Sequence, residues 1–284
     1  MHKINLAPAL MIFLTALPLQ AQDTNAAIND RFRIYLGGFW ANVDSEITIN
    51  GEIASPPPIN VEDVLGLEDS KGVVLGGARW RISRRNQIEF EFFQLDRFGV
   101  QDSTDADLGV GDFILESGSI DTTLDLSLGR LTYGFSLVRN DSMDVQLKAG
   151  LHIVDIAATL QLMGNVCDTT MPGQTMPPCP PSSSGTESED VTAPLPHFGG
   201  SFGYAFTPTI AARFQVIGFA IKLDGIDGSL VEVDADIDWS PWRHFGVGVG
   251  LRYFNFDFKG RTSELNGEFQ YEYWGPVLYV QTTF

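Results

Sequence analysis

Cations are scarce in this sequence. Its 284 residues contain 18 Lys and Arg against 36 Asp and Glu, a formal net charge of −18. Recognition of nucleic-acid phosphates needs clustered cations, so we expect no nucleic-acid partner. Charged residues make up only 19%, whereas 29 Gly, 20 Phe and 11% aromatic residues are high values. This composition excludes a disordered chain and indicates a β-rich one with unusual surfaces.

Long apolar runs are also scarce, and the one that stands out lies near the N-terminus. Lys3 precedes the apolar segment 6–19, and Ala21 follows as a small residue. This order is typical of a secretory signal peptide. The run contains two prolines and is shorter than the roughly 20 residues of a membrane-spanning helix. We therefore predict a signal peptide over 1–21 and a single exported domain over 22–284, without a transmembrane helix.

Only two cysteines occur, Cys167 and Cys179, both in one Pro- and Ser-rich stretch. An oxidising compartment favours their pairing, so we predict a disulfide, with two free thiols as the alternative. The sequence contains neither a CxxC motif nor a His/Cys metal spacing. We expect no metal site and no cofactor.

What the sequence does contain is strand-like alternation. Between Ser229 and Trp239, apolar residues alternate with Glu232 and three aspartates. One strand face is thus apolar and the other acidic, as in a soluble sandwich or a membrane barrel. Similar segments occur at 32–42, 73–83, 86–95, 119–138, 143–162, 193–206, 210–223, 229–239, 244–258 and 268–284.

The connections between these ten segments favour the barrel. Tight turns alternate with long loops near 43–72, 96–118 and 163–192. Short periplasmic turns, long extracellular loops and an even strand number are typical of outer-membrane barrels. We predict an all-β chain that forms a ten-stranded antiparallel transmembrane β-barrel, with eight or twelve strands as alternatives.

Aromatic residues support this fold independently, because they form two groups on the predicted lipid face. Nine residues of a tilted strand rise roughly 23 Å, close to the apolar height of such barrels. The two groups are Phe32, Trp80, Phe206, Trp239, Phe245 and Phe284 at the turn end, and Trp40, Tyr253 and Trp274 higher up.

The last strand ends on Phe284, with Val280, Leu278 and Trp274 on the same face. Here the chain resembles the small outer-membrane β-barrel proteins of Gram-negative bacteria, the OmpA/OmpW-like barrel class. The resemblance implies that Phe284 is an insertion signal read by the barrel-insertion machinery. It also implies a location in the outer membrane, in contact with its lipid and lipopolysaccharide. Thr282 departs from the aromatic or aliphatic residue often found at its position.

The opposite strand faces predict a charged barrel interior. Arg79 and Arg81 would lie across from Glu89 and Glu91, and Arg252 near Glu232. We favour a paired ladder that fills a narrow barrel; an ion-selective pore lining is the alternative. The ladder consists of Arg33, Arg79, Arg81, Glu89, Glu91, Arg130, Lys148, Arg213, Glu232, Asp234, Asp236, Asp238 and Arg252.

Nearer the loops the predicted interior becomes apolar. One interpretation is a vestibule for small apolar solutes, similar to OmpW-like barrels; the other is a first loop that folds back over these side chains through residues 61–67. The apolar set includes Phe93, Leu126, Leu128, Ile156, Phe219, Phe254 and Phe256.

Two histidines raise the question of catalysis. His152 and His197 fall on neighbouring predicted strands, with Asp155 near them in sequence, so a cluster for acid–base chemistry is geometrically feasible. The surrounding segments match no catalytic motif. We predict a non-enzymatic barrel with a mostly filled lumen and a narrow path for apolar solutes. A loop-mediated adhesin and a surface hydrolase using His152 and His197 are the alternatives.

The long loops are acidic, with seven Asp or Glu in 43–72 and seven in 96–121. Divalent cations bound at this rim could bridge it to lipopolysaccharide phosphates. A solvated acidic surface without a specific ion is the simpler interpretation.

Overall fold

A computed structural model describes residues 25–49, 59–103, 108–110, 113–168, 182–223, 226–261 and 266–284. The predicted signal peptide, residues 1–21, lies outside the described residues. So does Cys179, and with it the predicted disulfide to Cys167.

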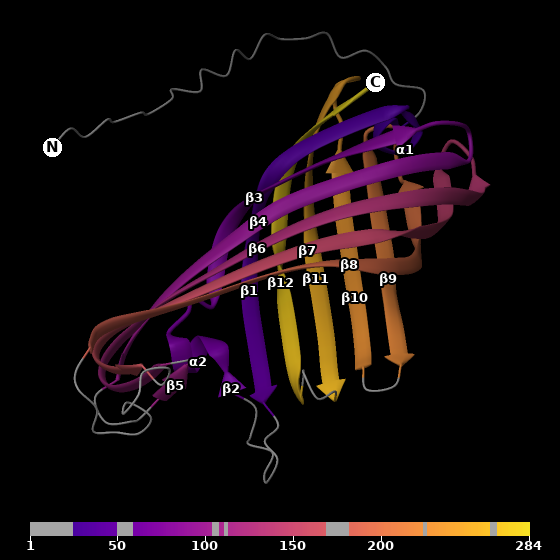
Figure 1. Ribbon diagram of the computed structural model, residues 1–284. Helices are drawn as coiled ribbons and strands as arrows, with labels where there is room; N and C mark the ends of the chain where they lie inside the picture. Colours follow the sequence, from indigo (N-terminus) through magenta and orange to yellow (C-terminus); the bar gives the residue numbers. More distant parts are fainter. Residues whose placement is uncertain are drawn as a thin grey trace, which may run out of the picture.

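Ten antiparallel strands form a closed barrel, as the sequence predicts (Figure 1). Each strand pairs with its neighbour in the chain, and the last pairs with the first, which closes the sheet. The strands are β1 (Phe32–Ile49), β3 (Ser70–Arg81), β4 (Asn86–Ser103), β6 (Phe113–Arg139), β7 (Met143–Asp168), β8 (Ser182–Ala205), β9 (Ile210–Leu223), β10 (Ile226–Trp239), β11 (Phe245–Arg261) and β12 (Asn266–Thr283).

Four short elements lie at the two ends of the barrel. Strand β2 (Ile59–Asn60) pairs with β1, and β5 (Leu108–Val110) pairs with β6. Helix α1 (Ala26–Asn29) precedes the barrel, and helix α2 (Val61–Leu65) follows β2. Neither helix has the length or apolar character to cross a membrane.

Alternation along each strand separates an apolar outside from a polar inside. Phe32 and Trp80 stack on the outer face with ring centroids 6.0 Å apart, and Trp40 and Trp274 are each 52% exposed there. Tyr253 of the predicted upper aromatic group is half-buried. The aromatic residues thus lie on the outer face of the barrel, where contact with water would be unfavourable and contact with lipid is favourable.

Several strands are longer than their sequence pattern predicts. Much of the predicted loops 96–118 and 163–192 belongs to β4, β6, β7 and β8, and β1 and β3 extend into 43–72. In these extensions most outward side chains are polar, and Asp96 lies opposite Asp125. Phe98 and Val100 of β4 are exceptions, each 50% exposed. The extensions lack a continuous apolar outer face, which is the pattern that predicts a strand in lipid, although their backbone ladders continue.

The barrel divides into two walls toward its loop end, which is the end away from the tight turns. Strands β4, β6, β7 and β8 sweep to one side, whereas β9 to β12 and β1 run in another direction (Figure 1). The β3–β4 ladder stops at Leu75↔Phe93, and the β8–β9 ladder stops at Phe198↔Gly218. Two seams therefore separate the walls.

Candidate site in the barrel interior

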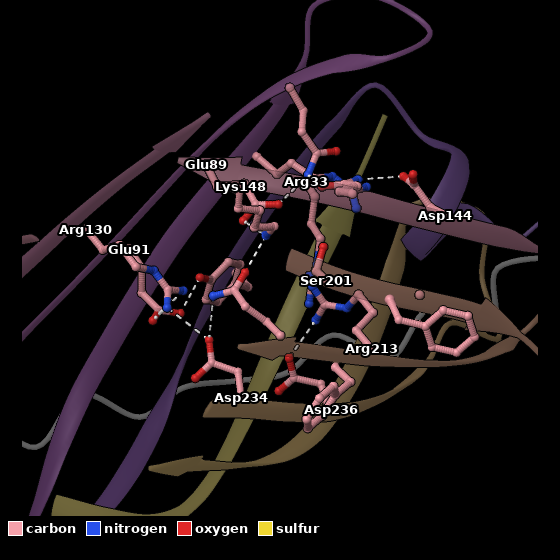
Figure 2. Close-up of a pocket in the computed structure, with 18 of the residues that line it drawn as sticks. Arg33, Glu89, Glu91, Arg130, Asp144, Lys148, Ser201, Arg213, Asp234 and Asp236 are labelled. Carbon is pink, nitrogen blue, oxygen red and sulfur yellow. Dashed lines mark hydrogen bonds and ion pairs between the residues drawn. The ribbon is translucent and has the colours of Figure 1, made fainter. Parts of the chain in front are cut away.

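Arg130 of β6 is the centre of a buried ionic network. Its guanidinium lies 3.1 Å from Glu91 of β4 and 2.9 Å from Asp234 of β10 (Figure 2). It also contacts Glu232 of β10. Strands β6 and β10 are not neighbours in the sheet. The contacts therefore cross the barrel interior and link its two walls.

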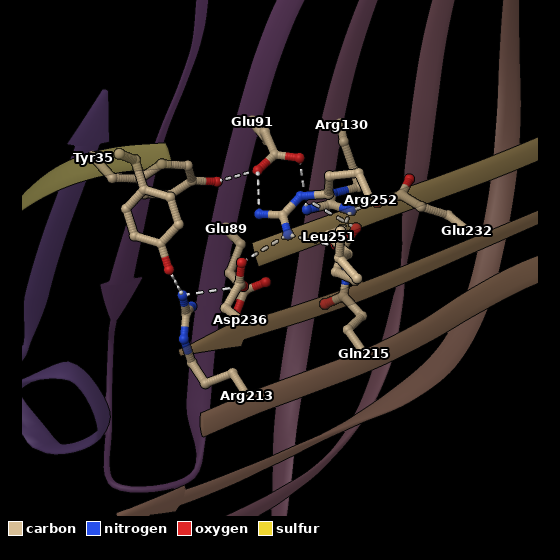
Figure 3. Close-up of polar contacts among 12 residues, drawn as sticks. Tyr35, Glu89, Glu91, Arg130, Arg213, Gln215, Glu232, Asp236, Leu251 and Arg252 are labelled. Carbon is tan, nitrogen blue, oxygen red and sulfur yellow. Dashed lines mark hydrogen bonds and ion pairs between the residues drawn. The ribbon is translucent and has the colours of Figure 1, made fainter. Parts of the chain in front are cut away.

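A second buried cation, Arg252 of β11, joins the same network. It lies 2.8 Å from Asp236, 3.3 Å from Asp234 and 3.8 Å from Glu91 (Figure 3). All of these side chains are buried, so each charge depends on its partners rather than on water.

Asp238 of β10 binds two further interior cations. It lies 3.1 Å from Arg33 of β1 and 2.7 Å from Arg213 of β9, and it accepts a hydrogen bond of 2.8 Å from the Tyr279 hydroxyl. Asp238 and Arg33 are almost fully buried. Each of the four inward-facing acids of β10 is thus paired within the barrel interior: Glu232, Asp234, Asp236 and Asp238.

The ladder residues lie inside the barrel, but several predicted partners are wrong. Arg79 lies opposite Glu89 in register, yet its guanidinium donates to the backbone, and Arg81 pairs with Asp144 at 2.7 Å. Arg252 pairs with aspartates and not with Glu232. Long side chains in a narrow barrel reach acids on distant strands, and adjacent-strand register does not reveal these partners.

A polar cavity of about 70 Å³ lies in this network, on the side of the turns (Figure 2). Lys148 of β7 points into this region, 2.5 Å from Glu89, and also contacts Gln215. This volume has room for a few water molecules and not for a substrate of ordinary size.

The segment Asn25–Asp30 crosses the turn end of the barrel. Arg79 donates to the carbonyl of Ala27 at 2.8 Å, and the Asn25 amide donates to the carbonyl of Thr207 at 3.1 Å. Ala27 and Ile28 are buried against Ala211 of β9. The sequence analysis missed this segment, for which the only signal was the short apolar run 26–28 between polar residues.

On the loop side of the ionic network lies an apolar cluster. Phe39, Phe93 and Tyr273 meet edge to face with centroids 5.5–5.7 Å apart, and Phe254 stacks on Tyr273 at 4.9 Å. The predicted residues Phe93, Leu126, Leu128 and Phe254 are buried in this cluster, and Ile156, Phe219 and Phe256 pack on it partly exposed.

The first loop packs against the loop end of the same interior. Glu62 of α2 contacts the buried Arg97 of β4, and it accepts hydrogen bonds from the backbone and hydroxyl of Ser45 at 3.0 and 2.5 Å. Val61 and Leu67 are buried. The segment predicted to fold back therefore contacts both β1 and β4.

The two histidines form a buried chain of hydrogen bonds. His152 Nε2 lies 2.6 Å from Glu232, the Nδ1 atoms of His152 and His197 lie 3.1 Å apart, and His197 Nε2 lies 3.0 Å from the Thr132 hydroxyl. Asp155 is exposed on the outer face and accepts from Thr192, so its predicted proximity to the histidines is wrong. An odd spacing along a strand places Asp155 and His152 on opposite faces.

Glu91, Glu232 and Asp234 have ligand atoms within 4.8 Å of one another, a spacing that a metal ion could bridge. Arg130 lies among these carboxylates and contacts all three. Its guanidinium supplies the positive charge that a metal would supply, so this donor set does not fit a metal ion as it stands.

The C-terminal Phe284 lies where β12 pairs with β1 and the barrel closes. Its backbone exchanges two hydrogen bonds of 2.9 Å with Phe32, and its ring stacks on His244 at 5.3 Å. The ring is 59% exposed on the outer face.

No family model and no curated protein matches the sequence. Among solved structures, the outer membrane protease OmpT from Escherichia coli aligns with a TM-score of 0.57 and 9% identity, over 89% of this chain and 96% of that one. OprG from Pseudomonas aeruginosa aligns with a TM-score of 0.36 and 11% identity, over 92% and 99% of the two chains. Ail from Yersinia pestis aligns with a TM-score of 0.30 and 8% identity, over 87% and 97%. At such identities the similarity to OmpT is one of fold: the chain has the fold of a Gram-negative outer-membrane β-barrel.

Proposed function

We propose that this chain is a non-enzymatic protein of the Gram-negative outer membrane whose interior is closed to hydrophilic solutes and whose loop end offers a narrow path to small apolar solutes. The cross-barrel contacts of Arg130 are the observation that carries this proposal. A water-filled pore would leave these charges solvated, whereas here Arg130 and its three carboxylates are buried together.

Two further layers support a closed interior. Segment Asn25–Asp30 lies across the turn end, and the aromatic cluster around Phe93 lies on the loop side of the charges. A hydrophilic solute would have to displace both layers and separate the ion pairs between them.

The apolar path is supported by side chains that point inward without being fully buried. Ile156, Phe219 and Phe256 pack on the cluster and keep part of their surface exposed. Apolar side chains with few polar groups are the usual lining of a site for small apolar molecules.

Conductance tests the closed interior. The purified barrel in a planar lipid bilayer should conduct small ions no better than the bilayer alone. A large steady conductance would overturn the closed-interior proposal.

The proposal of a non-enzymatic protein is supported by the burial of His152 and His197, both 0% exposed. A catalytic group must reach its substrate, and neither ring does so here. Peptide and lipid A profiles should therefore be the same for cells that carry the wild type, His152→Ala or His197→Ala. A wild-type profile that differs from the profiles of both His152→Ala and His197→Ala would favour the surface hydrolase.

The adhesin alternative is favoured by one observation. Strands β6 and β7 contain 27 and 26 residues, far more than the ~10 residues that a strand needs to cross a bilayer. Deleting 165–188 should abolish any surface binding under this alternative while leaving the barrel folded.

A further inference from the structure

We propose that three arginines at the turn end of the barrel bind the phosphate headgroup of an anionic phospholipid in the inner leaflet of the outer membrane. They are Arg84 and Arg85, in the turn between β3 and β4, and Arg139 at the end of β6, and we call them the arginine corner. The inference rests on the proposed outer-membrane location, in which short turns lie on the periplasmic side. It is independent of the closed interior and of the apolar path.

Arg139 holds the β3–β4 turn against the end of β6. Its guanidinium donates to the carbonyl of Arg84 at 2.7 Å and to the carbonyl of Asn29 at 3.3 Å. The carbonyl of Arg85 accepts a hydrogen bond of 2.7 Å from the amide of Ser136, which is also in β6. The three arginines are therefore gathered in one place, although Arg84 and Arg139 are 55 residues apart in the sequence.

The turn that carries Arg84 and Arg85 has a well-fixed backbone. The amides of Ile82 and Ser83 both donate to the carbonyl of Asn86, at 2.9 and 3.2 Å. The Asn86 side chain donates to the Ser83 hydroxyl at 2.6 Å. A ligand at this turn therefore has to order arginine side chains and not the backbone, which lowers the entropic cost of binding.

The charges of the arginine corner are available to a ligand. Arg84 and Arg85 are exposed, and the half-buried Arg139 is bonded only to backbone carbonyls. Within the described residues no carboxylate forms an ion pair with any of the three, and Asp30 and Asp141 of the adjoining segments form none either. The corner is therefore positively charged, on a chain whose formal net charge is −18.

The outer face beside the arginine corner is apolar, which favours a lipid over a soluble anion. Trp80 of β3 and Ile82 after it are 43% and 42% exposed, and Leu137 of β6 is 48% exposed. A guanidinium offers parallel N–H groups to two phosphate oxygens. A phospholipid can place its phosphate on these groups and its acyl chains on the apolar side chains, whereas free phosphate gains only the first contact.

Two other turns differ from the arginine corner. The β8–β9 turn, residues 206–209, contains no charged residue, and the β10–β11 turn, residues 240–244, contains one cation, Arg243. In that turn the ring of Trp242 lies 5.7 Å from the ring of Phe245. Arg243 is exposed and has no second arginine in its turn, so it provides a matched control.

Lipid titration tests the site directly. Phosphatidylglycerol is added to the folded barrel in detergent, and bound lipid is counted by native mass spectrometry, with phosphatidylcholine as the zwitterionic comparison. The wild type should bind phosphatidylglycerol more tightly than phosphatidylcholine. Replacing all three arginines by Gln should weaken phosphatidylglycerol binding at least about tenfold, since each cation at an anionic surface contributes roughly fivefold. Arg243→Gln should bind it as the wild type does, and each variant should keep the heat-modifiable gel mobility of a folded barrel.

Chemical protection gives a second measurement on the unaltered chain. In vesicles that contain phosphatidylglycerol, Arg84 and Arg85 should react with phenylglyoxal more slowly than in vesicles of phosphatidylcholine alone. Arg243 should react equally in both, as read by mass spectrometry of its peptide. Inorganic phosphate added to the phosphatidylcholine vesicles should not protect Arg84 or Arg85, because it has no acyl chains to contact the apolar face.

The outcomes separate the lipid site from the proposed location. A barrel that inserts into neither kind of vesicle would overturn the location. A barrel that inserts but binds phosphatidylglycerol equally with and without the three arginines would overturn the lipid site alone. Protection by inorganic phosphate would also overturn it, in favour of a site for free anions. If the three substitutions abolish binding to isolated peptidoglycan and leave lipid binding unchanged, the partner is the cell wall and the lipid site is wrong.

Discussion

The Nδ1 atoms of His152 and His197 lie 3.1 Å apart, and this contact fixes where the protons of the two rings lie. An ionised Glu232 carboxylate accepts hydrogen bonds and has no proton to donate, so His152 Nε2 carries the proton of this contact. With both rings neutral, His152 Nδ1 is then an acceptor and His197 Nδ1 the donor. His197 Nε2 in turn accepts from the Thr132 hydroxyl.

We predict this pair of tautomers, Nε2–H for His152 and Nδ1–H for His197, in the folded barrel. Nitrogen NMR of the histidine rings distinguishes the four ring nitrogens directly. His197→Gln should alter the ring signals of His152, whereas His244→Gln at a turn should not. A doubly protonated His152 ring would contradict the prediction.

The histidine hydrogen-bond chain also shows which features of the interior can be predicted from the sequence. Period-two alternation places His152 and His197 on the inner face, and it also excludes Asp155, three residues from His152. The identity of Glu232 as partner depends on how the closed barrel brings β10 toward β7. Adjacent strands can be paired from turns, but contacts across the barrel depend on its diameter and tilt.

Strand ends illustrate the same limit. Gln94 and Asp96 interrupt the apolar outer face of β4 beyond Phe92, while the pairing with β6 continues to Ser103. Backbone ladders do not require apolar side chains, so the pattern predicts the part of a strand in lipid and not the part beyond it. Pro194 and Pro196 of β8 lie just beyond Phe198, where the β8–β9 ladder stops, and prolines have no N–H group to donate. Alternation alone does not use this signal.

Arg130 should be the most costly single residue of the ionic network to replace. Arg130→Met leaves Glu91, Glu232 and Asp234 without their shared cation, and breaking a buried ion pair costs about 3–5 kcal/mol. Urea unfolding of the barrel in lipid vesicles, followed by tryptophan fluorescence, measures this loss.

The exposed Arg84→Met in a turn is the control and should change the free energy of unfolding by less than about 0.5 kcal/mol. Adding Glu232→Gln to Arg130→Met should recover part of the loss, because one uncompensated charge is removed. Equal stability of the Arg130→Met and Arg84→Met barrels would refute the central role of Arg130.

The N-terminal segment should shield two interior arginines from the turn end. Arg79 and Arg81 donate to the carbonyls of Ala27 and Ile28. Deleting residues 22–29 should make both guanidiniums reactive toward phenylglyoxal, as read by mass spectrometry of the folded barrel. Conductance should stay at background, because the aromatic cluster remains.

Arg33 is the internal control for this deletion. It is 2% exposed and bound to Asp238, away from the deleted carbonyls, so it should stay unreactive in both forms. Reactivity of Arg79 that is the same with and without the segment would show that the segment does not cover this end.

Gly99 should be required for the first loop to occupy the seam between β3 and β4, where Leu67 pairs with Gly99. A Cβ added there would lie 2.6 Å from the Leu65 carbonyl oxygen and 2.7 Å from Gly66, so Gly99→Ala must push the loop away. Such overpacking costs about 1–3 kcal/mol, and a glutamate-specific protease should then cleave after Glu62 and Glu68 faster than in the wild type. Gly129→Ala is the matched control, because its added Cβ would meet no atom closer than 3.9 Å. Unchanged cleavage in Gly99→Ala would mean that the loop occupies the seam without this contact.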